Sequence, residues 1–170
     1  MQTPIFSATD EQKLMATLWA SQVKDDPLTF VRLAFPWGKP GTPLEGHSGP
    51  RKWQREVLVE LRDHIKANGG RVDFQTFRMA TSSGRGIGKS ALVSWLVIWM
   101  LTTRIGSTTI VSANSEAQLR SVTWAAITKW LSMSLHSHWF EVSATRVLPA
   151  KWIAEPVSYT HLTLPTKRIV

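Results

Sequence analysis

Residues 82–90 read Ser-Ser-Gly-Arg-Gly-Ile-Gly-Lys-Ser, and this glycine-rich run decides the expected fold. It ends in Gly-Lys-Ser, as the pattern G-x-x-x-x-G-K-[ST] does, but it has Ser83 in place of the first glycine. Glycines let backbone N–H groups turn inward around a phosphate, and a following helix directs the positive end of its dipole at the same anion. The run therefore predicts a phosphate-binding loop between a strand and a helix.

The side chains of this loop have expected parts in holding a nucleotide. Lys89 would reach the β- and γ-phosphates, and the hydroxyl of Ser90 would coordinate Mg²⁺. Arg85 would face the γ-phosphate as an arginine finger or as a sensor of its loss, with a solvated loop charge as the alternative. The cofactors expected are ATP and Mg²⁺. The backbone around the phosphates would be that of Ser83, Gly84, Gly86, Ile87 and Gly88.

The segments that flank the loop fit a strand and a helix. Residues 74–80 are predicted as a strand, and residues 88–103 as a helix that is apolar nearly all round and packs inside a sheet sandwich. A β-branched strand is expected over 108–113, and a weaker one within 140–147. This alternation of strands and helices favours an α/β fold with a parallel sheet flanked by helices.

A further helix is expected after the second strand. Asn114 or Ser115 can cap it, because both side chains accept hydrogen bonds from free backbone N–H groups. The residues spaced to lie on its buried face are Leu119, Val122, Ala126, Trp130 and Leu131.

Two helices are expected near the N-terminus. The first would run to about residue 24, with Thr9 and Asp10 offering a cap. The second would begin with Asp26 as N-cap and Pro27 as first helical residue. The apolar side chains of the two helices would be Leu14, Met15, Leu18, Trp19, Val23, Phe30, Val31 and Leu33.

Residues 35–50 are rich in Pro and Gly and are predicted to form a loop. Apolar residues from Trp53 to Ile65 then follow helical spacing, and Asn68-Gly69-Gly70 would end that helix. We therefore expect an N-terminal helical region and loop over 1–49 and the nucleotide-binding core over 50–156.

The composition indicates a folded, basic chain. Its 170 residues are 43% apolar, and 20 Lys and Arg against 12 Asp and Glu give a net charge of +8, which favours a polyanionic partner. The chain has no cysteine, which excludes a disulfide scaffold and a thiolate metal site. The longest apolar run, 91–101, is well short of the ~20 residues that cross a bilayer, and no secretory signal is visible. We therefore expect an intracellular protein with no membrane contact.

The last stretch, 157–170, reads VSYTHLTLPTKRIV and breaks the pattern of the rest. It resembles the conceptual translation of a transposon-end sequencing adapter and holds the single tyrosine of the chain. We expect it to be an assembly artefact that truncates a longer gene. A genuine C-terminal strand is the alternative.

Two segments outside the loop also suggest nucleotide contact. Gln54 opens the helix after Pro50, and a Gln amide can pair with both N6 and N7 of adenine, although most helical Gln side chains are simply solvated. Trp53 is either a core residue or a stacking platform. Residues 113–118, Ala-Asn-Ser-Glu-Ala-Gln, directly follow the second strand, at the strand end where parallel sheets bind ligands.

Trp53-Gln54, SSGRGIGKS over 82–90 and SANSEAQLRSV over 112–122 together resemble the N-terminal ATPase part of the large terminase subunit of tailed bacteriophages and prophages. The resemblance covers roughly residues 26–150. It implies a P-loop NTPase of the RecA/ASCE-like type. It also implies that Gln54 contacts adenine, that Lys89 and Ser90 hold the phosphates and Mg²⁺, and that Arg85 assists hydrolysis or coupling.

The same resemblance implies a motor that moves double-stranded DNA into a viral capsid, with a separate C-terminal nuclease. Its partners would be the portal protein and the small terminase subunit, its assembly a homo-oligomeric ring, and its location the cytoplasm of the bacterial host.

The carboxylates that such a motor needs are missing from this sequence. Hydrolysis requires a strand ending in Asp or Glu, and the acids after Lys89 are Glu116, Glu141 and Glu155, none preceded by an apolar run. No Asp follows Asp73, so the two-metal nuclease cluster is missing as well. We therefore expect a sheet truncated before the Walker B strand, and a chain that binds nucleotide weakly or not at all and does not hydrolyse it.

Two other functions stay open. One is a helicase-type nucleic-acid translocase, and the other is a non-enzymatic basic module whose glycine loop clamps DNA phosphate.

Several residues outside the loop have two possible roles. A basic helix surface could contact DNA or simply be solvated; its residues are Arg51, Lys52, Arg55, Arg62 and Lys66. His136 and His138 could be metal ligands but are more typical of a loop pair. Core and groove packing is expected for Trp95, Trp99, Trp124, Trp130 and Trp139, with base stacking as the minor alternative because duplex DNA hides the faces of its bases.

Overall fold

The computed structural model describes residues 7–69, 76–82, 84, 86–104, 106–154 and 161–163. Its helices are α1 (Ala8–Leu18), α2 (Ser21–Lys24), α3 (Pro27–Ala34), α4 (Lys52–Ala67), α5 (Lys89–Thr103), α6 (Glu116–Gln118), α7 (Ala125–Met133) and α8 (Lys151–Ala154), with a π-helix η1 (Leu119–Trp124) and a 3₁₀-helix η2 (Ser137–Trp139). Its strands are β1 (Thr108–Ile110), β2 (Phe140–Val142), β3 (Arg146–Pro149) and β4 (His161–Thr163).

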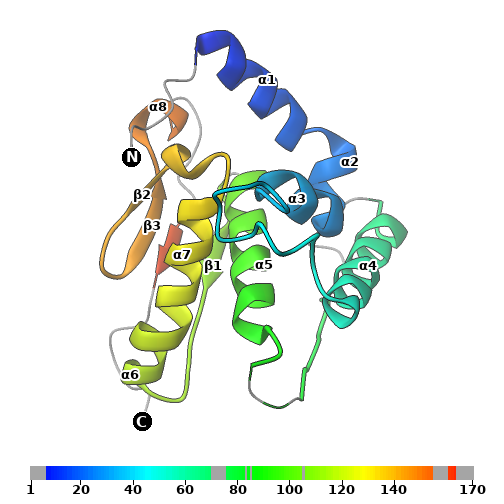
Figure 1. Ribbon diagram of the computed structural model, residues 1–170, viewed down its shortest axis with the longest axis vertical. Helices are drawn as coiled ribbons and strands as arrows, with labels where there is room; N and C mark the ends of the chain where they lie inside the picture. The colour runs from blue at the N-terminus through cyan, green and yellow to red at the C-terminus, as the bar shows by residue number, and fades with distance from the viewer. Residues whose placement is uncertain are drawn as a thin grey trace.

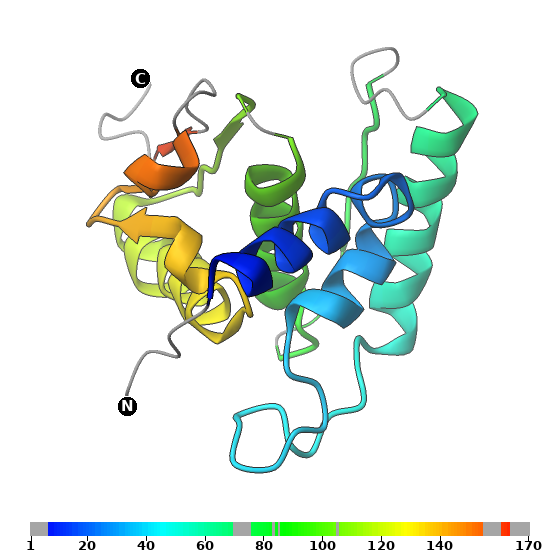
Figure 2. The ribbon, with the colours of Figure 1, turned by 90° about the horizontal axis from the view of Figure 1, so that it is seen from above.

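Helix α5 lies in the middle of the molecule. Figure 1 shows α7 on one side of it and α3 with α4 on the other, and Figure 2 shows the same order from above. The predicted helix over 88–103 is thus confirmed, with Gly88 as its N-cap residue. Its apolar side chains pack mainly against α7 and α3, so helices surround it more than strands do. Its buried apolar residues are Leu92, Trp95, Val97, Ile98, Trp99 and Leu101.

The N-terminal segment forms two helices where the sequence predicted one. Ser7, not Thr9 or Asp10, is the N-cap of α1, and the Asp10 side chain completes a capping box with it. The chain leaves the helical region at Ala20, where φ is −58° and ψ is 141°, before α2 begins. This break turns Leu18 and Val23 into the core.

The start of α3 is as predicted. The carboxylate of Asp26 accepts hydrogen bonds from the N–H groups of Leu28 and Thr29, and Pro27 is the first helical residue. The helix buries Phe30 and Val31 completely. Leu33, which was predicted on the apolar side, is 42% exposed.

The loop over 35–50 and the helix after it are confirmed. No helix or strand forms between α3 and α4. α4 ends at Asn68, and Gly69 follows with φ +64°, a conformation that favours glycine. Gly70, the last residue of the predicted stop signal, lies outside the described residues.

The strands are short and form one sheet in the order β1-β4-β3-β2. β1 and β4 run parallel, and the other two pairs are antiparallel. The segment predicted as one weak strand within 140–147 is instead the hairpin β2–β3, because the chain turns back at residues 143–145. β4 lies within the tail suspected to be an artefact. That residues 157–170 are an assembly artefact remains a prediction.

The strand predicted before the loop is absent from the part of it that the structure describes. Residues 76–80 carry no strand, and 74 and 75 lie outside the described part of the chain. The second predicted strand, 108–113, is shortened to β1. The parallel sheet of a phosphate-loop fold therefore stays a prediction.

A π-turn reshapes the helix after β1. Ser115 caps α6 as predicted, its hydroxyl accepting from the N–H of Gln118 at 3.2 Å. The wider turn of η1 then separates the buried side chains of Leu119 and Trp124 by five positions. Val122, predicted on the buried face, is 50% exposed as a result.

Candidate functional site

The loop before α5 is held by the first turn of α4 through three successive carbonyl oxygens, those of residues 86–88. Side chains from the start of α4 donate to all three, although the two segments are more than thirty residues apart in sequence. The bonds run from Arg51 Nη1 to Gly86 at 3.4 Å, from Trp53 Nε1 to Ile87 at 3.2 Å, and from Gln54 Nε2 to Gly88 at 2.9 Å. The carbonyl oxygens of residues 86–88 therefore all accept hydrogen bonds from side chains at the start of α4.

The backbone of the same loop alternates in handedness. Gly86 has φ +76° and Gly88 has φ +96°, while Ile87 and Lys89 have no positive φ. Successive residues of opposite hand turn their N–H groups toward one point, the arrangement called a nest, which binds anions. The N–H groups of residues 86–88 donate to no acceptor within the described chain. This loop can therefore offer several amides to one phosphate group.

Lys89 and Ser90 occupy the first two positions of α5 and are both exposed. They thus stand where the positive end of the helix dipole is strongest. The carbonyl of Ser90 accepts from the hydroxyl of Ser94 at 2.7 Å within the helix. Gly84, also exposed, lies on the same loop. Ser83 and Arg85, two of the predicted site residues, lie outside the described residues.

Gln54 forms hydrogen bonds that hold the loop in place in this structure. Its side chain is only 2% exposed. Its Oε1 accepts from the N–H of Arg51 at 2.8 Å, and its Nε2 donates to the carbonyl of Gly88. Both ends of the amide are thus engaged with backbone and the side chain is buried, so its amide edge is not open to an adenine in this arrangement. Contact of Gln54 with adenine stays a prediction. Trp53, predicted as a stacking platform or a core residue, likewise uses its indole N–H on the loop.

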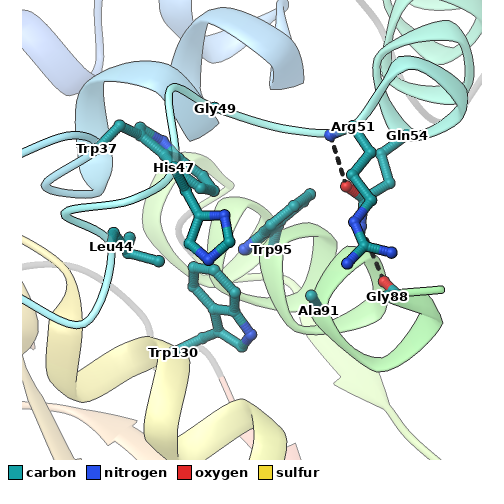
Figure 3. Close-up of a pocket in the computed structure, with 10 residues that line it drawn as sticks. All are labelled: Trp37, Leu44, His47, Gly49, Arg51, Gln54, Gly88, Ala91, Trp95 and Trp130. Atoms are coloured by element: carbon teal, nitrogen blue, oxygen red, sulfur yellow. Dashed lines mark hydrogen bonds between the residues drawn. The ribbon is translucent and has the colours of Figure 1, made fainter. Parts of the chain in front are cut away.

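A pocket of about 160 Å³ opens beside this contact. It is lined by Trp37, Leu44, His47, Gly49, Arg51, Gln54, Gly88, Ala91, Trp95 and Trp130 (Figure 3). Sequence analysis missed it because half of its lining residues come from the long loop and from α7. The one available signal was the spacing of Gly88, Ala91 and Trp95, which places them on one face of α5.

The five tryptophans predicted as core residues do pack in the core. Trp95, Trp99, Trp124 and Trp139 are buried, and Trp130 is partly buried against them. Trp95 and Trp130 also line the pocket, so packing and ligand contact are compatible for these two.

The basic surface of α4 is interleaved with acids. Lys52 and Glu56 lie 4.0 Å apart, and Arg62 pairs with Asp63 at 2.8 Å. Arg51 and Arg55 are exposed at the start of the helix. Such a mixed surface is a weaker phosphate-binding face than the bare count of Lys and Arg predicted.

His136 and His138 contact different partners and do not form one site. His136 is buried and shares a hydrogen bond of 2.8 Å with the hydroxyl of Thr102, and burial, followed by the charge of His138, lowers its pKa to about 3. His138 pairs with the carboxylate of Glu11, which also accepts from Trp139 Nε1 at 2.8 Å. Both histidines therefore tie helices together. Among the described residues, no cluster of three or more potential metal ligands occurs.

Comparison of the chain with models of protein families, with curated proteins and with solved structures finds no match. Within the described ranges, no helix has the length and apolar character to span a membrane.

Proposed function

We propose that residues 84–90 bind the phosphates of a nucleoside triphosphate. The observation that carries the proposal is the commitment of three successive loop carbonyls to α4, since it leaves the N–H groups of the same residues for an anion. The N-terminus of α5 adds its positive dipole end. In this site Lys89 pairs with the β- and γ-phosphates, and the hydroxyl of Ser90 coordinates Mg²⁺.

The sequence resemblance supports ATP as the nucleotide and a larger role for the protein. In this proposal the chain is the ATP-binding part of a large terminase subunit that couples hydrolysis to movement of double-stranded DNA into a capsid. It acts in a ring, with the portal protein and the small terminase subunit, in the cytoplasm of a bacterial host.

We expect no hydrolysis by this chain itself. The nearest acid after the loop in sequence, Glu116, is exposed and pairs with Arg120 at 2.8 Å. Glu141 is exposed on β2. Neither carboxylate follows a buried strand that could aim it at a magnesium ion.

Titration of the 170-residue chain with a fluorescent ATP analogue and Mg²⁺ tests the phosphate site. Lys89→Ala should weaken binding at least tenfold, because a hydrogen bond to a charged group contributes about 1.5–3 kcal/mol. Lys66→Ala removes another exposed lysine, in the last turn of α4, and should leave the affinity unchanged. Equal affinities of the native chain and the Lys89 variant would contradict the proposal.

Duplex DNA offers the discriminating control. A chain that binds DNA but no nucleotide would be a basic DNA-binding module, and the glycine loop would then clamp backbone phosphate only.

A further inference from the structure

Three indole rings form one wall of the pocket beside the loop. Trp95 lies 5.0 Å from Trp130 and 5.7 Å from Trp37, between ring centroids, and both pairs meet edge to face. Trp37 and Trp130 are 5.8 Å apart. The rings come from three different elements, the long loop, α5 and α7, and pack against one another. Figure 3 shows the His47 side chain lying near these rings.

Trp95 carries a polar group that the protein does not satisfy. Its side chain is 2% exposed, and its indole N–H has no hydrogen-bond partner among the described residues. Leaving a buried donor without an acceptor costs free energy. The nitrogen itself is buried, so this indole N–H reports on the wall of the pocket without contacting what enters it.

The size and place of the pocket indicate what could enter it. Its volume of about 160 Å³ is below the roughly 300–1,000 Å³ of pockets that enclose a whole drug-sized ligand. It can therefore hold one ring system and not a complete nucleotide. Gly88 and Ala91 belong both to its lining and to the start of α5, so a ring in the pocket lies next to the phosphate site.

We propose that this aromatic pocket receives the planar base of the bound nucleotide and selects it by ring shape and stacking. The proposal rests on the phosphate site proposed above. Aromatic side chains stack on any planar base, because every base has a π-face. Hydrogen-bonded selection for adenine needs an accessible amide, and the amide of Gln54 is buried and bonded to Arg51 and Gly88. Gln54 is thus a positioning residue for the loop, and the pocket binds adenine and guanine nearly alike.

A ligand series on the native chain tests this without any variant. ATP, GTP and inorganic tripolyphosphate are titrated by calorimetry in the presence of Mg²⁺. ATP and GTP should bind within about threefold of each other, and tripolyphosphate, which lacks a base, should bind at least tenfold more weakly, in line with the value of ~1–3 kcal/mol per stacked base. The indole N–H resonance of Trp95 should shift with both nucleotides and not with tripolyphosphate.

A substitution in the wall gives the second measurement. Trp130→Leu should weaken ATP binding about tenfold and leave tripolyphosphate binding unchanged, since only the base touches this ring. Trp152→Leu is the matched control, because Trp152 is half-exposed on α8 and stacks on His138 instead. It should change neither affinity.

The outcomes separate the two proposals. Tripolyphosphate binding as tight as that of ATP would overturn the base pocket and leave the phosphate site standing. A preference for ATP over GTP above thirtyfold that disappears in Gln54→Ala would overturn selection by shape and make Gln54 the reader of the base. Binding of none of the three ligands would overturn the phosphate site and this inference with it.

Discussion

Gly88 is the residue at which the loop, α4 and α5 meet. It has φ +96°, where a side chain is strained, and its carbonyl accepts the amide of Gln54 at 2.9 Å. A Cβ atom placed on Gly88 would lie 2.7 Å from Nε2 of Gln54. A glycine is therefore needed here for two reasons, the backbone conformation and the close approach of a buried amide.

Gly88→Ala should lower the free energy of unfolding by about 2–3 kcal/mol. Roughly 1–2 kcal/mol comes from the left-handed conformation and about 1 kcal/mol from the displaced hydrogen bond of Gln54. Urea unfolding followed by circular dichroism gives the measurement.

Gly86→Ala is its matched control. Gly86 has φ +76° but nothing within 4 Å of an added Cβ, so only the conformational cost should appear. If both variants lose the same stability, the contact between Gly88 and Gln54 contributes nothing measurable.

Helix α3 illustrates how a short element is fixed from its first residue. Asp26 accepts from the N–H groups of Leu28 at 3.0 Å and Thr29 at 3.1 Å, and its other oxygen accepts from the Thr29 hydroxyl at 2.9 Å. Eight residues are too few for a stable isolated helix, so the cap and the burial of Phe30 and Val31 hold it together.

Asp26→Ala should destabilise the protein by about 1 kcal/mol, the usual cost of losing an N-cap side chain. Asp26→Asn keeps an oxygen in the same place and should stay within a few tenths of a kcal/mol of the native protein. Thermal unfolding of the two variants side by side decides the point. Equal losses would mean that charge, and not the capping geometry, matters at this position.

The segment that follows β1 shows where element-level prediction failed. Its apolar residues were read with the ordinary helical period, which put Val122 inside. The π-turn of η1 adds one residue to the spacing between Leu119 and Trp124 and rotates Val122 to the surface. Packing of Trp124 against the core decides this rotation, and a single-sequence period cannot detect it.

At the scale of the whole molecule, His136 joins elements that are distant in sequence. Its ring bonds to Thr102 of α5 and meets Phe30 of α3 edge to face at 5.7 Å between centroids. Burial, and secondly the charge of His138, lower the pKa of His136 from 6.5 to about 3. The folded protein therefore keeps this histidine neutral where the unfolded chain would protonate it.

Stability should consequently fall as the pH drops below about 6.5. The unfolded state binds the proton between pH 6.5 and 3 and the native state does not, so the contribution is complete above pH 6.5 and is lost toward pH 3. The expected slope is on the order of 1 kcal/mol per pH unit, measured as the free energy of unfolding between pH 7 and pH 4.

His136→Phe keeps an aromatic ring but cannot titrate, so its stability profile should be flatter than that of the native protein. The ion pair of Glu11 with His138 is present in both proteins and cancels in the comparison. Parallel profiles would show that His136 does not set the acid sensitivity.

The sequence by itself determined the features that depend on neighbouring residues. These are the glycine turn before α5, the helix α5 itself, which is apolar nearly all round, the Asp-Pro start of α3 and the end of α4 at Asn68. Each depends on backbone preferences or caps within a few residues, which is why the pattern alone was sufficient.

Tertiary structure decided which side chains contact one another across the fold. The amide of Gln54 bonds to Arg51 and Gly88, because a buried amide must satisfy whichever backbone groups the fold brings to it. Its predicted contact with adenine stays a prediction. The pocket likewise exists only because the long loop carries Trp37 and His47 across to Trp95 and Trp130. Contacts between residues far apart in the chain depend on how the elements pack, and no local pattern encodes that packing.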